Sequence, residues 1–194
     1  MQGLQITRLR VGPIQTNCYL LALDGRDDCL VIDPGDEPER IVQAKGGRKL
    51  DAILFTHGHF DHIGGAKALC EPGTRVYIHA LDAPMLHDSR KNAGWMLMGE
   101  TTEGPDATDY VAEGDRMTCA GLTFTVLHTP GHTPGSVCYL LEDEEGSLLF
   151  SGDTVMAMGI GRTDLPGGSS AQMRESLEKL KPYLQTCHVL GGHG

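Results

Sequence analysis

The stretch "THGHFDH", residues 56–62, places His57, His59, Asp61 and His62 within one short segment. Each of these side chains is costly to remove from water, and four of them this close compete for the same space. A metal ion resolves that competition, because imidazole nitrogens and carboxylate oxygens are common metal ligands. The stretch directly follows an apolar run, "LDAILF" at 50–55, which is typical of a buried strand. It therefore predicts a metal site in the loop after that strand.

Three later segments carry further candidate ligands. "TPGHTPGS" at 129–136 contains His132, "SGDT" at 151–154 contains Asp153, and "GGHG" at 191–194 contains His193. Each follows a predicted strand, where a rigid scaffold can hold reactive groups. Glycine beside each residue lets the backbone approach a common centre closely. The remaining histidines lack such neighbours and are expected to be structural or exposed: His79, His87, His128 and His188.

Composition limits the classes of partner. The 194 residues suit a single domain spanning 1–194, with 40% hydrophobic residues and a formal net charge of -10. The negative charge argues against nucleic acid, whose phosphates are bound by clustered Lys and Arg. It does not exclude an anionic small molecule, because a metal site sets its own local field. The sequence gives no signal for oligomeric state.

Cysteine usage and hydropathy indicate a compartment. The six cysteines are scattered and form no C-x-x-C pair, as expected for thiols in a reducing environment. The N-terminal segment lacks the apolar run of a signal peptide, and no stretch reaches membrane-spanning length. We expect a cytoplasmic protein without a membrane partner.

Short strands dominate the predicted structure. In the first half, strands are expected at 4–11, 17–23, 29–35, 50–57 and 74–79, with helices at 36–46 and 62–73. The second half shows three strands within 122–153, a helix at 169–184 capped by Ser169 or Ser170, and a closing segment at 187–194. Residues 90–110 are a candidate mobile loop. Two β-rich halves that each carry helices predict two packed sheets with helices outside.

The ordered motifs resemble a known family. H-x-H-x-D-H, a Gly-His-Thr loop, S-G-D-T and a late G-H-G together resemble the metallo-β-lactamase superfamily over essentially the whole chain. The resemblance implies an α/β (α+β) fold, a four-layer αβ/βα sandwich with the site at one edge. It implies a first metal held by His57, His59 and His132, a second held by Asp61, His62 and His193, and Asp153 as the bridge. "IDPG" around Asp33 and "TNCYLL" at 16–21 match supporting segments of the family.

One branch of the superfamily is favoured. "GIGRTDLPGG" at 159–168 looks like the short glyoxalase II-like hydrolases, the hydroxyacylglutathione hydrolases. True β-lactamases lack the bridging carboxylate that Asp153 would provide, and diiron oxygen reductases have a Glu where His59 stands. The resemblance implies hydrolysis of a thioester such as S-lactoylglutathione, by attack of a hydroxide that bridges two divalent ions. Zinc is the first candidate metal, with iron or manganese as alternatives, and Asp61 would orient the hydroxide or accept its proton.

Two other functions stay open. Persulfide dioxygenases share these motifs and bind one non-haem iron through the equivalents of His57, His132 and Asp153. A metal-binding domain without catalysis is the third reading. Glyoxalase II relatives also carry a Lys and a Tyr that hold glutathione, where this chain has Arg162, Thr163 and Asp164. Arg162 would either clamp a substrate carboxylate or pair with Asp164 and shape the loop.

Overall fold

Two β-sheets form the centre of the molecule. The computed structural model describes residues 3–142 and 146–194. The first sheet has six strands in the order β1 to β6, with antiparallel pairing at β1–β2–β3 and parallel pairing at β3–β4–β5–β6. Its strands are β1 (Leu4–Val11), β2 (Thr16–Leu23), β3 (Asp28–Ile32), β4 (Lys49–Leu54), β5 (Arg75–His79) and β6 (Asp109–Val111).

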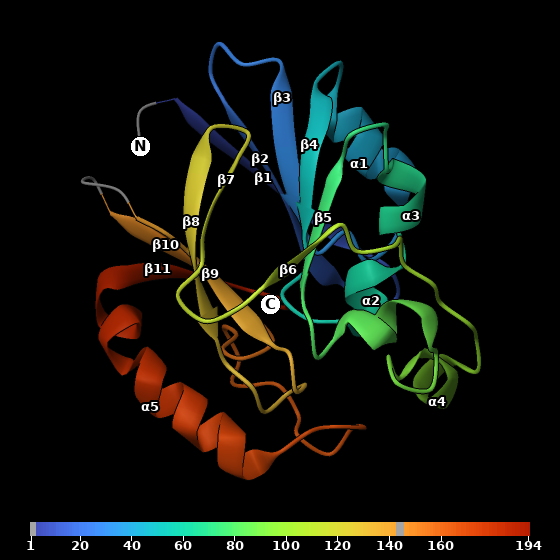
Figure 1. The fold of residues 1–194 in the computed structure, drawn as a ribbon, viewed down its shortest axis with the longest axis vertical. Coiled ribbons are helices and arrows are strands. Elements are labelled where there is room, and N and C mark those ends of the chain that lie inside the picture. Colours follow the sequence, from blue (N-terminus) through green and yellow to red (C-terminus); the bar gives the residue numbers. More distant parts are fainter. Residues whose placement is uncertain (1–2, 143–145) are drawn as a thin grey trace.

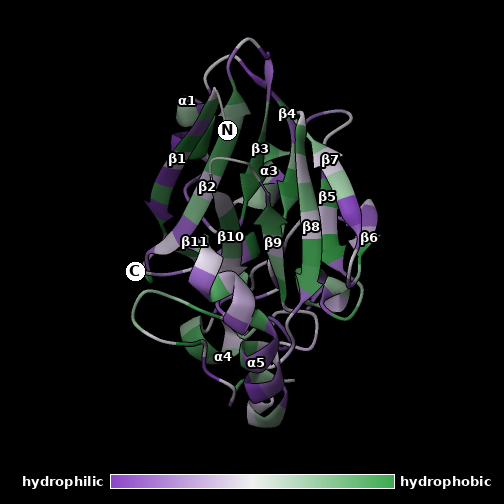
Figure 2. Ribbon diagram, turned by 90° about the vertical axis from the view of Figure 1, so that its left-hand side faces the viewer, coloured by the Kyte–Doolittle hydropathy of each residue, from purple (hydrophilic) through white to green (hydrophobic). Residues whose placement is uncertain are grey.

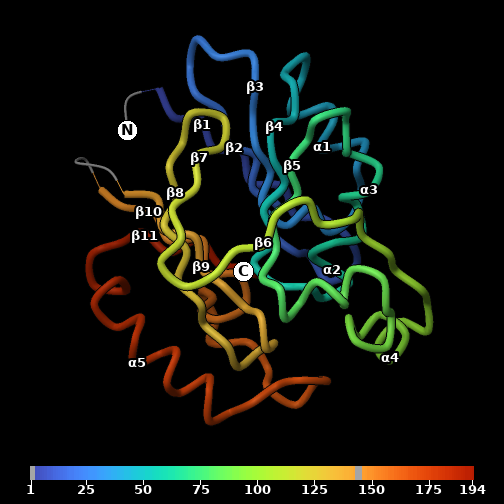
Figure 3. Tube along the Cα trace, viewed as in Figure 1, coloured from blue at the N-terminus to red at the C-terminus, as the bar shows by residue number. Residues whose placement is uncertain are grey.

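The second half of the chain builds the other sheet. It has five strands in the order β11-β10-β9-β8-β7, and β10 pairs with β11 in parallel. Figure 3 shows the division by colour, with the blue-to-green chain in one layer and the yellow-to-red chain in the other. The strands are β7 (Arg116–Cys119), β8 (Leu122–His128), β9 (Val137–Leu141), β10 (Ser147–Gly152) and β11 (Cys187–Gly191).

Helices cover the outer face of each sheet. On the first sheet lie α1 (Pro38–Lys45), α2 (Phe60–Ile63) and α3 (Ala66–Leu69), and on the second lies α5 (Ser170–Thr186), as Figure 1 shows. Buried apolar side chains of both sheets, such as Leu54 and Tyr139, form the core between them. Two smaller clusters pack Ile41 of α1 on the first sheet and Leu180 of α5 on the second. The four-layer αβ/βα arrangement is therefore confirmed.

Hydropathy explains why β8 and β9 are inner strands of the second sheet. In Figure 2, β8 and β9 are coloured mostly hydrophobic, whereas α5 mixes hydrophobic and hydrophilic residues. Every residue of β9 is buried, as expected for a strand that is covered on both faces. The mixed pattern of α5 instead matches one face on the sheet and one in solvent.

The predicted helix at 62–73 is wrong in extent. The structure has two short helices here, α2 and α3, and an extended residue follows at Cys70. The interruption lies at Gly64 and Gly65, residues of low helix propensity. The amide of Gly65 donates to the carbonyl of Pro34 at 2.9 Å and not to a carbonyl of its own helix. Packing against the segment after β3 therefore breaks the helix.

The other differences are smaller. The candidate loop at 90–110 contains a short helix, α4 (Gly94–Met98), and the start of β6, and a 3-10 turn at Ala83–His87 precedes it. The helix expected at 169–184 continues to Thr186, and the amide of Gln172 donates to the hydroxyl of its N-cap residue Ser169 at 3.3 Å. The link between the second and third strands expected within 122–153 includes residues 143–145, which lie outside the described residues. None of the helices described is both long and apolar enough to span a bilayer.

Candidate metal centre

The segment that opens the site follows β4 directly. His57 and His59 lie in the irregular stretch after the strand, and Asp61 and His62 lie in α2. The stretch is held by Asp33, whose two carboxylate oxygens accept from the backbone amide of Thr56 at 2.8 Å and from its hydroxyl at 2.6 Å. Asp33 also contacts the Nδ1 atom of His62 at 2.9 Å. The supporting residue in "IDPG" therefore orients the side chain of His62.

Three histidines form a first cluster, defined as His57, His59 and His132. One ring nitrogen from each lies within 4.8 Å of the others. The closest approach is 2.8 Å, between Nδ1 of His59 and Nε2 of His132. The three residues are between 1% and 3% exposed, so the cluster is shielded from bulk water. These are the residues that the sequence assigned to the first metal.

A second cluster lies beside the first and consists of Asp61, His62 and His193. The Oδ2 atom of Asp61 is 3.2 Å from Nε2 of His62 and 3.4 Å from Nε2 of His193. Oδ2 also accepts from the hydroxyl of Thr16 at 2.7 Å, which fixes the carboxylate. The sequence assigned these three residues to the second metal.

Asp153 lies between the two clusters. Its Oδ2 atom is 3.4 Å from Nε2 of His132 in the first cluster and 3.5 Å from Nε2 of His193 in the second. Its Oδ1 atom is 3.5 Å from Nε2 of His62. Ligands about 2.1 Å from a tetrahedral metal lie roughly 3.4 Å from one another. The distances of 3.2 to 3.5 Å from Asp61 and Asp153 to the histidine nitrogens therefore match the edges of metal coordination shells, whereas the 2.8 Å between His59 and His132 is shorter.

Unpaired buried atoms also fit a metal. The Nε2 atoms of His57 and His62 and the Oδ1 atom of Asp153 are buried without a hydrogen-bond partner, and these three residues form a group whose ligand atoms lie within 4.8 Å of one another. Buried polar atoms are almost always paired, so three unpaired ones in neighbouring residues point to a missing ligand. Their chemistry, two imidazole nitrogens and a carboxylate oxygen, suits a divalent transition metal.

The pKa shifts divide the histidines into two groups. Burial, with the neighbouring His132, lowers the pKa of His59 to about 3, and burial also holds the pKa of His57 well below its usual value. Both rings are therefore neutral and free to donate a lone pair. At His193 burial acts in the same direction, but Asp153 and Asp61 outweigh it and raise the pKa to about 9.

The second cluster therefore attracts positive charge. Burial alone would lower the pKa of His62, but Asp61, Asp33 and Asp153 outweigh it and raise that pKa well above its usual value. Burial would raise the pKa of Asp61, yet His62 and His193 hold it well below its usual range. Without metal, protons carry the positive charge here, and a divalent cation could replace them.

Further contacts hold His193, the last candidate ligand, in place. The amide of Asn17 donates to the carbonyl of Gly192 at 2.7 Å, and its side chain donates to the carbonyl of Gly191 at 3.0 Å. The Tyr19 hydroxyl donates to the same Gly191 carbonyl at 2.7 Å. The start of β2 therefore supports the segment that carries His193. Sequence reasoning identified "TNCYLL" only through the family motif, because no local pattern reveals these long-range bonds.

The other candidate residues lie outside the two clusters. The guanidinium of Arg162 donates twice to the carboxylate of Asp164, at 2.7 Å each, on an exposed loop. His79 and His128 stack with ring centroids 4.2 Å apart, and the exposed His87 pairs with Asp106 at 3.0 Å.

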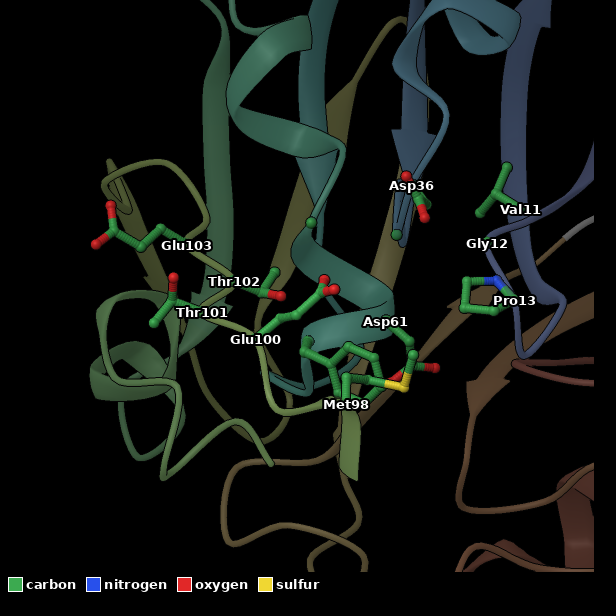
Figure 4. Close-up of a pocket in the computed structure, with 13 residues that line it drawn as sticks. Val11, Gly12, Pro13, Asp36, Asp61, Met98, Glu100, Thr101, Thr102 and Glu103 are labelled. Atoms are coloured by element: carbon green, nitrogen blue, oxygen red, sulfur yellow. The ribbon is translucent and has the colours of Figure 1, made fainter. Parts of the chain in front are cut away.

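A cavity adjoins the second cluster. It has a volume of about 310 Å³, and Asp61 lines it. Figure 4 shows Val11, Gly12 and Pro13 on one side of this space and the segment from Met98 to Glu103 on the other. The residues that line it include the acidic Asp36, Glu100 and Glu103, and the hydroxyl-bearing Thr101 and Thr102. The cavity therefore gives a small molecule access to Asp61.

Two sequence relatives bear on this site. The chain is 42% identical over 194 residues to "Probable metallo-hydrolase YqgX" of Bacillus subtilis, covering 96% of this chain and 89% of the relative. It is 32% identical over 197 residues to the hydroxyacylglutathione hydrolase GloC of Haemophilus influenzae, covering 98% and 91%.

Solved structures and a family profile agree with the fold. The structure of the BLEG-1 B3 metallo-beta-lactamase has a TM-score of 0.88 and 35% identity, covering 98% of this chain and 92% of that one. The structure of TTHA1623 in a di-iron-bound form has a TM-score of 0.81 and 36% identity, covering 97% and 92%. Residues 11–193 match the profile of the Metallo-beta-lactamase superfamily. With its His and Asp clusters at the ends of the strands, the chain belongs to the metallo-beta-lactamase superfamily.

Proposed function

We propose that this metallo-hydrolase holds two divalent ions, zinc being the first candidate, and hydrolyses a thioester such as S-lactoylglutathione or a related hydroxyacyl thioester. The observation that carries the proposal is the position of Asp153, whose Oδ2 atom is 3.4 Å from His132 of the first cluster and 3.5 Å from His193 of the second. A carboxylate placed in this way can bridge two ions. Such a pair, when bound, would polarise a carbonyl and lower the pKa of water from about 15.7 to near 7.

The residues around the ions have distinct tasks. Asp61 lines the cavity and is fixed by the hydroxyl of Thr16 at 2.7 Å, so its carboxylate can orient the attacking water and take its proton. His57, His59 and His132 are buried and would exclude bulk water from the first ion. Thr16 therefore acts on the reaction through Asp61.

A thioester suits this arrangement. Its leaving thiol has a pKa near ~8.5 and departs as a thiolate without a strong proton donor. The cavity lining supplies carboxylates and hydroxyls, which can accept hydrogen bonds from a hydroxyacyl group. The likeness to the hydroxyacylglutathione hydrolase GloC, at 32% identity over 98% of this chain, supports the same substrate class.

We place the two ends of the substrate differently. Asp36 and Glu100, with Glu103 paired to Lys67 at 3.4 Å, would make the cavity unfavourable for an anionic group. A neutral acyl group fits there, and an anionic thiol portion would lie outside it. Two ions with Asp61, Asp153 and a hydroxide carry a net charge of about +1, which favours an anionic substrate at the centre.

Metal analysis combined with a substrate panel tests the proposal. Protein purified without added metal would be analysed for elemental content, and hydrolysis would then be followed for several thioesters and, because of the BLEG-1 likeness, a β-lactam. We expect two ions per chain and thioester turnover that a chelator abolishes and zinc restores. Absence of chelator-sensitive turnover on every thioester would end the proposal.

A mononuclear iron persulfide dioxygenase is the second candidate. His57, His132 and Asp153 form a two-His, one-carboxylate set, with His132 Nε2 3.4 Å from Asp153 Oδ2. The di-iron form of TTHA1623, at 36% identity, supports iron as a possible metal. Oxygen consumption with glutathione persulfide would distinguish the two, since the hydrolase should consume none.

A further inference from the structure

Asp82 is a buried carboxylate outside both metal clusters. It lies three residues beyond β5 and is 0% exposed. Its hydrogen-bond donors are neutral, being two backbone amides and one hydroxyl. Burial raises its pKa, and the donors of Thr133, Gly58 and Gly135 act against that shift. A buried carboxylate balanced only by neutral donors is costly, so its retention calls for a specific reason.

The three donors come from the two loops that carry the first cluster. Oδ2 of Asp82 accepts from the amide of Gly58 at 3.0 Å, and Gly58 lies between His57 and His59. The same oxygen accepts from the hydroxyl of Thr133 at 2.6 Å, directly after His132. Oδ1 accepts from the amide of Gly135 at 2.7 Å. One carboxylate thus joins the loop after β4 in the first sheet to the loop after β8 in the second.

Glycines let both loops come this close. A Cβ atom on Gly135 would lie 2.7 Å from Cγ and Oδ1 of Asp82, too close for any other residue to fit without movement. A Cβ atom on Gly58 would lie 2.7 Å from Cβ of Met85 and 3.0 Å from the Asp82 carbonyl. The approach is therefore built into the backbone of both loops.

We propose that Asp82 is a positioning residue for the first metal ion, locking the His57–His59 loop against the His132 loop at the ligand spacing that the ion needs. The inference rests on the proposed metal centre but not on the substrate. Asp82 touches no ligand nitrogen, so it acts through the backbone of the loops. Groups that orient metal ligands typically contribute about 10- to 100-fold in metal affinity.

The test compares Asp82→Asn with a matched control, Asp51→Asn. Asp51 also joins distant segments, since its Oδ2 atom accepts from Arg75 at 2.7 Å and from the amide of Ala120 at 2.6 Å, but it lies at the opposite end of β4. In Asp82→Asn, the new amide would face a donor of one loop. We expect Asp82→Asn to lower the affinity for one of the two ions by about 10- to 100-fold. Asp51→Asn should bind both ions with wild-type affinity.

Two measurements beyond activity decide the outcome. Metal affinity is determined by competition with a chelator. The Co²⁺-substituted protein gives an absorption spectrum for each site, with His57→Ala and His193→Ala as references for the first and second ion. The Asp82→Asn spectrum should lose the feature that His57→Ala loses. Wild-type affinity and spectrum in Asp82→Asn would overturn the inference, even if the variant is less stable.

Thr133 supplies a second route if Asp82→Asn does not fold. Thr133→Val removes one donor and keeps the carboxylate, so it should lower the affinity for the same ion by a smaller factor. Thr133→Ser keeps the hydroxyl and should restore the wild-type affinity. Equal metal affinity of Thr133→Val and wild type would also contradict the inference. A wild-type protein that binds two ions but cleaves no thioester would remove the proposed substrate and leave the role of Asp82 intact.

Discussion

At the scale of single residues, Asp153 is the group on which both of the proposed ions would depend. Its two oxygens lie 3.4 to 3.5 Å from nitrogens of His132, His62 and His193. Asp153→Asn removes the negative charge and one acceptor, so neither ion keeps its full ligand set. We expect metal content to fall below two ions per chain and kcat/KM to fall by about 100-fold or more. Elemental analysis and steady-state kinetics measure both.

The control for Asp153 is another aspartate in an ion pair. Asp28 pairs with Arg26 at 2.7 Å at the molecular surface, where such pairs contribute little to stability. Asp28→Asn should keep both ions and full activity. A wild-type metal content in Asp153→Asn would show that this carboxylate does not bridge.

We expect His193 to make metal binding depend on pH. Burial opposes protonation, but Asp153 and Asp61 raise the pKa of His193 from 6.5 to about 9 in the metal-free protein. Because this pKa is raised, protonated His193 stabilises the metal-free fold fully below pH 6.5, and that contribution is lost as the pH rises through about 9. A metal ion must displace this proton, and the raised pKa of His62 adds a second one, so its affinity for the second cluster should rise by at least about tenfold per pH unit in this window.

Calorimetry can count the displaced protons. Metal would be titrated into metal-free protein at pH 7.5, in buffers of different ionisation enthalpy. The titrations should show that at least one proton is released for each ion bound at the second cluster. The Tm of metal-free protein should also fall between pH 6.5 and about 9, and His193→Gln should reduce that dependence. A second-site affinity that does not change with pH would refute this account.

At the scale of elements, the sequence predicted strands but not all of their ends, since the strands expected at 29–35 and 50–57 each end three residues earlier, at Ile32 and Leu54. The alternating or continuous apolar runs predicted β1 with its observed bounds and β2 within one residue. The pattern at 62–73 has helical periodicity, but Gly64 and Gly65 pack against the chain at Gly35 and Asp36, which interrupts the helix. Such a tertiary contact leaves no local signal. For the same reason sequence reasoning found the seven ligand candidates, which share motifs, and missed Asp82, whose partners lie 24 to 53 residues away.

The break between α2 and α3 leads to a prediction of stability. Gly64 has helical dihedral angles, φ −64° and ψ −31°, so helix propensity alone predicts that Ala would stabilise this position. A Cβ atom there would instead lie 2.6 Å from the Gly35 carbonyl oxygen. We expect Gly64→Ala to lower the free energy of unfolding by about 1–3 kcal/mol, measured by urea denaturation.

Gly47 provides the matched comparison for Gly64. A Cβ atom on Gly47 would meet no atom within 4 Å, so Gly47→Ala should be neutral or stabilising by up to about 1 kcal/mol. If Gly64→Ala stabilised the protein by the same amount as Gly47→Ala, the contact with Gly35 would not be what breaks the helix between α2 and α3.

At the scale of the whole molecule, the two halves of the chain share one site. His57, His59, Asp61 and His62 follow a strand of the first sheet, whereas His132, Asp153 and His193 follow strands of the second. A bound ion therefore links the sheets directly, in addition to the apolar core between them. The sequence predicted two β-rich halves, but only the paired sheets explain why ligands from both are needed.

Metal removal should accordingly destabilise the whole fold and not one loop. An ion present at about 1,000 times its Kd stabilises the native state by about 4.1 kcal/mol. For a chain of this length, each kcal/mol corresponds to about 2–4 °C in Tm. Treatment with a chelator should therefore lower Tm by about 8–16 °C per tightly bound ion, in a single transition detected equally by circular dichroism and by the fluorescence of Trp95. If the ions joined only local segments, chelation would leave the main transition in place and add a separate early one. Because the ligands come from both sheets, we expect one transition that moves as a unit and returns when zinc is added back.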